Sequence, residues 1–533
     1  MKNLRHLAIV AAALSLGCRC TPAPAPTPET QISQETGGRP ALVMLIVVDQ
    51  LRADLLDRYG DLFTGGFKRL RAQGHSYVNA AQDHAATETA VGHTTLGTGV
   101  YPSRHGIIAN QWYEMAGGRW VLVSNVGDST VKTVGASARF GASPVRDQRP
   151  TFAEWLMAAS PSSKVASVSG KDRGAIQPVG HVHNAFVYYF DSPSSRFVTS
   201  TYYRNTDPSW VTKFNSRIGE HAVDTVWDLR VPKAQLSRAD RDTVPTEGNG
   251  RDTFFPHKFS NEGTAGGFWQ WWETTPQLDV ATLDMAKTMV SSLDLGKDAA
   301  PDFLNISLSA TDKVGHAYGP LSREQLDNLL RLDRELGDFF NYLDRTVGKN
   351  RWTVMLSADH GVLDSPEDII ARGEYAHRLT PAESHTLDSL RAHADSATDK
   401  AAAARELVAS LKKLPIIADA WTHEDLEKAS TDSFVVLQQR SMYPGREPDR
   451  FSRQGVEYRF IPGILAGARG SSHGQTYWYD RHVPMIFMGP GIPAGKDESR
   501  AATVDFAPTF AKILGIPAPK DLDGKVLAGV VTR

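Results

Sequence analysis

Ala41-Leu-Val-Met-Leu-Ile-Val-Val48 is the stretch that decides the fold of this chain, and Asp49 follows it directly. No polar residue interrupts the run. A strand with one solvent-exposed face would alternate polar and apolar residues, whereas a parallel strand covered by helices on both faces is apolar throughout. We therefore predict that residues 41–48 form a central strand of a parallel sheet.

Similar apolar runs recur along the chain, at residues 164–169, 302–308, 352–357 and 484–488. Between two of them, residues 322–347 repeat Leu and Phe at helical spacing, and Ser322 with Gln325 forms a predicted capping box at the start. Strand, helix and strand in succession make the unit of a parallel α/β sheet. The predicted fold class is therefore α/β, with a central, mostly parallel sheet flanked by helices.

Two segments depart from this pattern. Residues 193–267 are polar and rich in turn-forming residues, and residues 367–454 are dominated by Ala-rich, charged helical sequence. We expect residues 41–533 to form a single domain in which these two insertions crown the sheet. Ligands of open α/β sheets bind beyond the carboxyl ends of the strands, so the residues after each strand are the candidate functional residues.

The first forty residues predict export. Residues 1–20 have a basic start and an apolar stretch, Leu7 to Leu16, which is too short to span a bilayer. Either Cys18 is lipidated and becomes the mature N-terminus, or the leader is cleaved and the protein is released. Residues 21–40, rich in Pro and Thr, predict a disordered tether. We expect a periplasmic, outer-membrane or extracellular protein, anchored to lipid if Cys18 is modified.

The composition limits the kinds of binding and catalysis that the folded body can carry out. The net charge of -2 gives no reason to expect nucleic-acid binding. The only cysteines, Cys18 and Cys20, lie in the leader, which removes disulfides, a cysteine nucleophile and thiolate metal ligands from the folded body. A metal site in this body must use His, Asp and Glu.

Metal-ligating residue types follow the predicted strands repeatedly. Alone, each has an ordinary explanation as a helix cap, a surface ion pair or a chance dipeptide. Together they supply nitrogen and oxygen donors for two metal ions, and such donors without thiolate favour zinc, with manganese, cobalt or iron as alternatives. The six candidate ligands are Asp49, Asp312, His316, Asp359, His360 and His473.

The segment Thr87-Glu-Thr89-Ala-Val-Gly-His93, with Asn110 further on, resembles the nucleophile region of the alkaline phosphatase superfamily. It is most similar to bacterial alkaline phosphatases with a threonine nucleophile. The resemblance implies that Thr89 is the nucleophile and that Thr87 is not. It also implies two zinc ions per chain. One is held by Asp312, His316 and His473, and the other by Asp49, Asp359 and His360, with Thr89 as a further ligand of this second ion.

Lys171 and Arg173 lie two residues apart just after the predicted strand that ends at Ser169. Without further context they would be charged residues of a solvated turn. The pair resembles the one with which phosphomonoesterases of this superfamily hold terminal phosphate oxygens, and related phosphodiesterases lack it. The resemblance implies that Lys171, Arg173, Asn110 and the backbone N–H of Ala90 bind the substrate phosphate.

The predicted function is zinc-dependent hydrolysis of small-molecule phosphate monoesters through a phosphothreonine, with no obligate protein partner. The alternative on the same scaffold is a phosphodiesterase or nucleotide pyrophosphatase. Sulfatases share the fold but need a modified Cys or Ser in a motif that the Thr89 region lacks, and cofactor-independent phosphoglycerate mutases use a serine nucleophile. A catalytically silent, ligand-binding surface lipoprotein is the alternative from a different class, and it gives no reason for six metal ligands.

Overall fold

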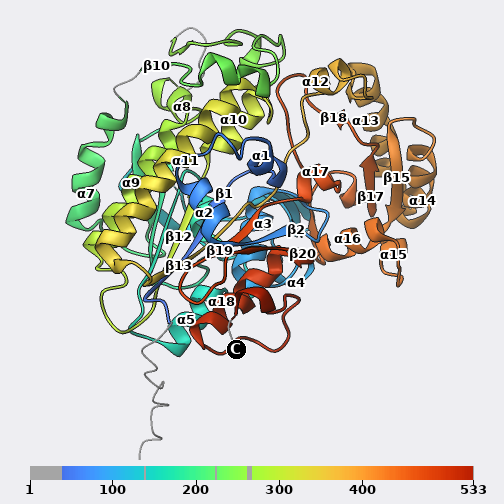
Figure 1. Cartoon of the computed structure of the whole chain (residues 1–533). Coiled ribbons are helices and arrows are strands. Elements are labelled where there is room, and N and C mark those ends of the chain that lie inside the picture. The colour runs from blue at the N-terminus through green and yellow to red at the C-terminus, as the bar shows by residue number, and fades with distance from the viewer. Residues whose placement is uncertain (1–38, 137–139, 223–224, 261–266, 532–533) are drawn as a thin grey trace, which may run out of the picture. The chain divides into compact units, whose positions relative to one another are not determined.

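A large sheet organises the computed structural model, which describes residues 39–531 except for 137–139, 223–224 and 261–266. Within these residues the sheet has eleven strands in the order β20-β2-β19-β13-β1-β12-β7-β8-β9-β5-β6, with β1 (Leu42–Val48) near its middle (Figure 1). The other strands are β2 (His75–Ala81), β5 (Gly127–Val134), β6 (Phe140–Ala142), β7 (Val165–Ser169), β8 (Phe186–Asp191), β9 (Arg196–Ser200), β12 (Asp302–Leu308), β13 (Trp352–Ser357), β19 (Met485–Met488) and β20 (Gly495–Ala502).

The central strands run parallel. β1 pairs with β12 and β13 on its two sides, and β7 and β8 continue the parallel part, whereas β19 and β9 run antiparallel to their neighbours. The predicted strands at 302–308 and 352–357 have the observed bounds, and those at 164–169 and 484–488 begin one residue later. The predicted α/β fold with a mostly parallel sheet is confirmed. Because the parallel strands share one direction, their carboxyl ends bring Asp49, Ser309 and Ala358 to the same edge.

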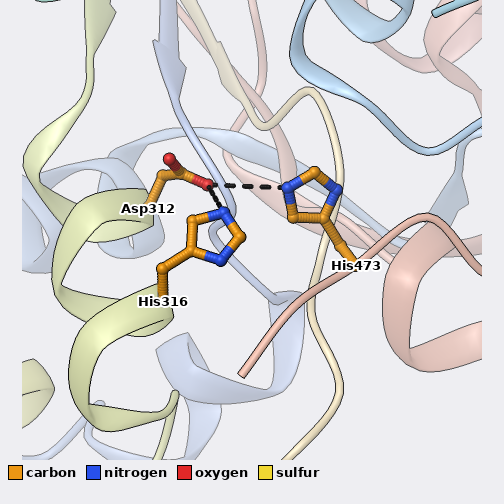
Figure 2. Close-up of side chains that lie close together, drawn as sticks. All are labelled: Asp312, His316 and His473. Atoms are coloured by element: carbon orange, nitrogen blue, oxygen red, sulfur yellow. Dashed lines mark ion pairs between the residues drawn. The ribbon is translucent and has the colours of Figure 1, made fainter. Parts of the chain in front are cut away.

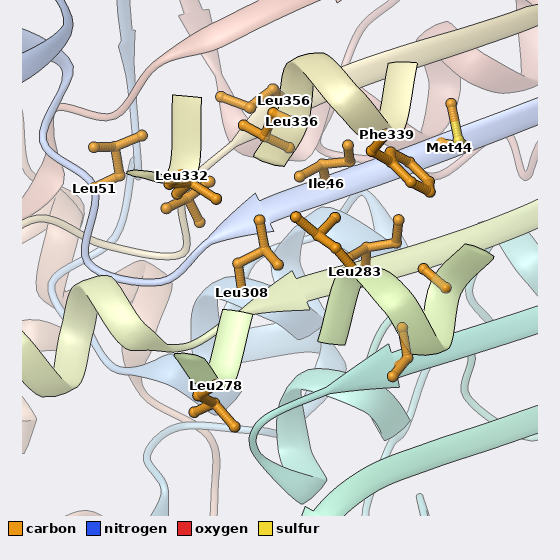
Figure 3. Close-up of a cluster of buried hydrophobic side chains, with 14 of the residues drawn as sticks. Met44, Ile46, Leu51, Leu278, Leu283, Leu308, Leu332, Leu336, Phe339 and Leu356 are labelled. Atoms are coloured by element: carbon orange, nitrogen blue, oxygen red, sulfur yellow. The ribbon is translucent and has the colours of Figure 1, made fainter. Parts of the chain in front are cut away.

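Both faces of β1 are buried. Met44, Ile46 and Val48 belong to one core with helices α9 (Gln277–Ser292) and α11 (Arg323–Leu343). Figure 3 shows Met44 and Ile46 of this core together with Leu283 and Phe339. Val43, Leu45 and Val47 belong to a second core with α5 (Phe152–Ala159) and α18 (Phe506–Leu514). Since side chains alternate along a strand, an unbroken apolar run is what two covered faces require.

Helix α11 corresponds to the helix predicted at residues 322–347, and it ends at Leu343 in a short π-helical turn, Asp344–Gly348. Ser322 caps it, since its side chain accepts a hydrogen bond from the Gln325 N–H at 3.0 Å. The reciprocal half of the predicted capping box is replaced: the Gln325 side chain donates to the Thr311 carbonyl oxygen at 2.8 Å. Gln325 therefore ties α11 to α10 (Ala310–Tyr318).

The two predicted insertions have different bounds in the structure. The first begins later than residue 193, because β9 belongs to the central sheet. The second continues past residue 454, because β15 (Ile417–Thr422) pairs with β17 (Val456–Phe460), and β14 (His377–Arg378) with β18 (Ile464–Leu465). We call residues 366–465 the helical insertion. Its helices are α12 (Pro366–Ala371), α13 (Pro381–Ser396), α14 (Lys400–Leu411), α15 (His423–Leu426) and α16 (Ser433–Ser441).

The helical insertion has its own apolar core, in which Leu407, Leu411 and Val456 are buried. It also reaches the rest of the chain through β16 (Arg446–Glu447), which pairs antiparallel with β3 (Gln111–Ala116). β3 in turn pairs with β4 (Arg119–Ser124). The insertion is thereby joined to the segment that begins immediately after Asn110.

The described residues from Arg39 onward pack together as one unit. The predicted leader with Cys18, and the predicted tether apart from Arg39 and Pro40, lie outside the described residues. Among the residues that are described, no helix is both long and apolar enough to cross a membrane.

Candidate active site

All six predicted metal ligands lie beyond the ends of strands or on the segments that follow them. Asp49 follows β1, Asp359 and His360 follow β13, and α10 after β12 carries Asp312 and His316. His473 lies in the loop before α17 (Trp478–Arg481). Together they form two groups of three, Asp312, His316 and His473 in one, and Asp49, Asp359 and His360 in the other, and the potential ligand atoms of each group lie within 4.8 Å of one another.

The first group is shown in Figure 2. His316 Nε2 lies 3.1 Å and His473 Nε2 lies 3.7 Å from Asp312 Oδ1. The opposite ring nitrogens are fixed by backbone carbonyls: His316 Nδ1 is 2.8 Å from the Ser471 oxygen, and His473 Nδ1 is 2.6 Å from the Thr87 oxygen. Because a carbonyl can only accept, each Nδ1 carries a proton, and each Nε2 faces the shared space.

The second group repeats this arrangement. His360 Nε2 lies 3.5 Å from Asp49 Oδ1 and 3.7 Å from Asp359 Oδ2, while His360 Nδ1 is 2.9 Å from the Gly361 oxygen. Asp49 Oδ1, Asp359 Oδ2 and His360 Nε2 are buried and have no hydrogen-bond partner. Unpaired buried polar atoms are costly, so three of them converging on one space fit a bound cation.

The two groups adjoin each other. The rings of His360 and His473 stack with centroids 3.6 Å apart. Gln50 bridges the groups, because its backbone N–H donates to Asp359 Oδ1 at 3.1 Å and its side-chain Nε2 donates to Asp312 Oδ1 at 2.8 Å. Gln50 adopts a φ of 67°, in the left-handed region that non-glycine residues rarely occupy. Sequence reasoning missed Gln50, and its position beside Asp49 was the only available signal.

The titratable groups of the site shift one another's pKa values strongly. Burial, with His360 and His316 nearby, holds the pKa of His473 well below its usual range, so this imidazole is neutral. Burial opposes ionisation of Asp312, but His316 and Lys171 outweigh it and hold the pKa of that carboxyl well below its usual range. Burial and the neighbouring carboxylates Asp312 and Asp359 raise the pKa of Asp49 to about 6. Crowded carboxylates beside imidazoles form a donor set suited to divalent cations.

Thr89 is the first residue of α3 (Thr89–Thr98) and is almost fully buried. His93, one turn further on, hydrogen-bonds the Thr89 carbonyl oxygen through Nδ1 at 2.8 Å, and the same atom lies 3.3 Å from Asp359 Oδ2. Gly92 allows the helix to approach this closely, since a Cβ there would lie 2.1 Å from the Asp359 carbonyl oxygen. The start of α3 is therefore held against the second ligand group, whereas the Thr87 hydroxyl donates to the Gln475 oxygen at 3.0 Å.

Asn110 lies at the start of α3. Its Oδ1 accepts a hydrogen bond from the Ala90 N–H at 2.9 Å, and its own N–H donates to Glu88 Oε2 at 2.7 Å. The Ala90 N–H, which the resemblance implied as a phosphate donor, is thus occupied by Asn110. With Oδ1 turned to Ala90, the Asn110 amide nitrogen is the donor that this pair offers.

Lys171 and Arg173 occupy different environments. The Lys171 ammonium is buried 2.5 Å from both Asp49 Oδ2 and Asp312 Oδ2, so it joins the two ligand groups. Arg173 lies on α6 (Asp172–Ile176) with its side chain 26% exposed, and its buried Nε has no hydrogen-bond partner. The structure thus brings Lys171 in among the ligand carboxylates and leaves Arg173 as the outer cation.

Asp279 on α9 is a further residue that sequence reasoning missed. Its Oδ1 accepts hydrogen bonds from the N–H groups of Ser309 and Ala310, at 2.7 and 3.0 Å, where α10 begins. Burial raises the pKa of this carboxyl to about 7. Asp279 thereby anchors the helix that presents Asp312 and His316. It lies thirty residues before its partners, so no local pattern identifies it.

Comparisons with known proteins identify the relatives of this chain. The model of the family described as type I phosphodiesterase / nucleotide pyrophosphatase matches residues 43–446. Alkaline phosphatase PhoV of Synechococcus elongatus is 32% identical over 94% of this chain and 95% of its own. Alkaline phosphatase PafA of Elizabethkingia meningoseptica is 32% identical over 93% of this chain and 95% of its own.

The crystal structure of wild-type alkaline phosphatase PafA also matches the fold, with a TM-score of 0.85 and 32% identity over 93% of this chain and 99% of that chain. The family model covers more than half of the chain, and the relatives match nearly its whole length. The chain is therefore an enzyme of the alkaline phosphatase superfamily and belongs to the type I phosphodiesterase / nucleotide pyrophosphatase family.

Proposed function

We propose that this chain is an alkaline phosphatase that hydrolyses small-molecule phosphate monoesters with two zinc ions and a covalent phosphothreonine at Thr89. One observation carries the proposal: all three imidazoles of the two ligand groups have Nδ1 fixed on a backbone carbonyl, so that each Nε2 faces a carboxylate of its group. The relatives named alkaline phosphatase that match almost the whole chain support the same activity.

The residues fit two divalent cations. Asp312, His316 and His473 would hold one, and Asp49, Asp359 and His360 the other, with the Thr89 hydroxyl beside the second group. Imidazole and carboxylate donors without thiolate favour zinc. When bound, the ions would lower the pKa of the Thr89 hydroxyl and stabilise the negative charge on the departing alcohol oxygen.

The remaining steps of the reaction are carried out by side chains of the protein. Thr89 Oγ attacks phosphorus, a Thr89–phosphorus bond forms, and the bond from phosphorus to the alcohol oxygen breaks. Water then cleaves the phosphothreonine, which releases inorganic phosphate and restores the hydroxyl. The Asn110 amide, the Lys171 ammonium and the Arg173 guanidinium bind the non-bridging phosphate oxygens, and a dianionic phosphoryl group gains more from two cations than a monoanionic diester does.

The nucleophile is tested with Thr89→Ala and its matched control Thr87→Ala. We expect Thr89→Ala to lower kcat for nitrophenyl phosphate at least about 1000-fold while zinc stays bound, because it removes only the nucleophile. Thr87→Ala should cost less than about tenfold, because it removes one hydrogen bond to a carbonyl. Acid-quenched mass spectrometry should find phosphate on Thr89 during turnover. An equal loss from both variants would refute the assignment of Thr89.

Phosphodiester or nucleotide pyrophosphate hydrolysis is the second candidate, and the matched family model favours it by its description. Lys171→Ala with Arg173→Ala separates the two candidates. For a monoesterase, the double variant should lose activity on nitrophenyl phosphate far more than on its bis-ester. Preference of the unmodified enzyme for the bis-ester, or an equal loss on both substrates, would favour the second candidate.

We also propose that the chain is exported, because residues 1–20 have the composition of a secretory leader. Cell fractionation of the full chain tests this, and cytoplasmic recovery alone would contradict it. Fractionation of Cys18→Ser decides between lipidation and plain cleavage. Release of the variant from membranes that retain the parent would identify Cys18 as the lipid anchor.

A further inference from the structure

A third group of potential metal ligands lies in the helical insertion, outside the candidate active site. His423 lies at the start of α15, Glu447 on β16 and Glu457 on β17, and their ligand atoms lie within 4.8 Å of one another. His423 Nε2 is 3.3 Å from Glu457 Oε1 and 4.0 Å from Glu447 Oε2. Donors bound to one ion at about 2.1 Å are separated by roughly 3–4 Å, and the distances from His423 Nε2 to the two carboxylates fall in this range.

The three residues line a cavity of about 550 Å³. Its wall also includes Glu88, which precedes the nucleophile Thr89, and Gly474, which follows the ligand His473. The side chains of Glu447 and Glu457 are only 15% and 13% exposed. The group is therefore a built part of a concave space next to the active site, assembled from three separate segments of the chain.

The arginines of the cavity wall form hydrogen bonds with groups other than Glu447 and Glu457. The Arg446 guanidinium donates to the carbonyl oxygens of Gly106 and Arg146, and Arg459 donates to the Tyr477 hydroxyl and to Asp419. Two poorly exposed carboxylates therefore face each other with one imidazole between them.

We propose that His423, Glu447 and Glu457 bind a third divalent cation of the zinc class, separate from the two ions of the active site. One imidazole and two carboxylates form a nitrogen and oxygen donor set of the kind that zinc and manganese accept. Three protein ligands leave room for water from the cavity.

The position of this cation indicates a role. It would cross-link α15, β16 and β17, and β16 pairs with β3 in the register Glu447 to Tyr113. β3 begins directly after Asn110, which caps the nucleophile helix. A filled site would therefore hold the wall of the insertion against the segment that positions Asn110. The inference does not depend on the proposed catalytic function.

The test measures zinc bound per chain. Metal-free protein is equilibrated with Zn²⁺, freed of unbound metal by dialysis and analysed by mass spectrometry of the metal, alongside thermal unfolding with and without zinc. The variants are Glu457→Gln and His423→Gln, and Glu427→Gln is the matched control, because Glu427 lines the same cavity but lies outside the ligand group.

We expect three zinc ions in the unmodified chain and in Glu427→Gln, and two in Glu457→Gln and His423→Gln. The latter two should also lose part of the rise in unfolding temperature caused by zinc. Two zinc ions in the unmodified chain, three in both Glu457→Gln and His423→Gln, or equal loss in Glu427→Gln would overturn the proposal.

Failure of the proposed catalytic function would give a different result. Asp359→Asn should remove zinc from the group of Asp49, Asp359 and His360 and abolish turnover, whether or not the third site exists. Turnover that survives without zinc would therefore contradict the two-zinc active site, and it would leave the count in Glu457→Gln as the test of the third site.

Discussion

Gly92→Ala tests how Thr89, the proposed nucleophile, is positioned. The new Cβ would lie 2.1 Å from the Asp359 carbonyl oxygen and 2.6 Å from its Cα, whereas ordinary contacts begin at 3.4 Å. Both neighbouring atoms are backbone, so no side-chain rotation can relieve the clash. The start of α3 and the segment that carries Asp359 must therefore separate by about 1 Å.

That separation moves Thr89 away from the second ligand group. A displacement of about 1 Å at a reacting atom costs roughly 100-fold in rate, or about 2.7 kcal/mol of transition-state stabilisation. Overpacking of this kind also lowers the free energy of unfolding by about 1–3 kcal/mol. We therefore expect kcat/KM for nitrophenyl phosphate at saturating zinc to fall roughly 100-fold. The unfolding temperature should fall as well.

Two controls separate displacement from simple instability. Gly97→Ala strains the far end of the same helix, where its Cβ would lie 2.9 Å from Pro178 Cα, and it should cost stability with a smaller loss of rate. Gly219→Ala meets no atom within 4 Å and should change neither. Unchanged kcat/KM in Gly92→Ala, or the same loss in Gly97→Ala, would refute the contact between α3 and Asp359 as the positioning device.

Other predictions concern residues around the site. Asp279→Ala leaves the Ser309 and Ala310 N–H groups without their acceptor, so we expect zinc affinity, measured by competition with a chelator, to fall about 10–100-fold. Asp279→Asn keeps an acceptor oxygen and should lose less affinity. Equal zinc affinities in the two variants would contradict the anchoring role. His257 is buried between Asp252 and Glu324, and although burial opposes it, these carboxylates raise its pKa from 6.5 to about 9. Its contribution of about 3 kcal/mol to the free energy of unfolding is thus fully present below pH 6.5 and is lost as the pH rises through about 9. Between about pH 6 and about pH 10, the unfolding temperature of His257→Gln should therefore vary less than that of the parent. Parallel curves of unfolding temperature against pH would contradict this. Removal of zinc by a chelator should lower the unfolding temperature, because Asp49 Oδ1, Asp359 Oδ2 and His360 Nε2 lose their partner. Added zinc should restore the unfolding temperature. An unaltered unfolding temperature would contradict a cation at that group.

The central strands and the ligand types were accessible from the sequence because both are encoded locally. An apolar run such as residues 41–48 must bury both faces wherever it lies, and a residue directly after a parallel strand must emerge at the carboxyl edge of the sheet. Together with the resemblance around Thr89, this was enough to predict the α/β fold and to name all six candidate ligands.

Contacts between distant segments were decided only by the tertiary structure. Gln50 bridges the two ligand groups, Asp279 anchors α10, and Lys171 enters the carboxylate cluster through loop geometry and strand register, which no local pattern records. The bounds of the helical insertion depended on the pairing of β15 with β17 across more than thirty residues. The group of His423, Glu447 and Glu457 exists for the same reason, since three segments of ordinary composition become a single cavity wall only after the insertion has folded.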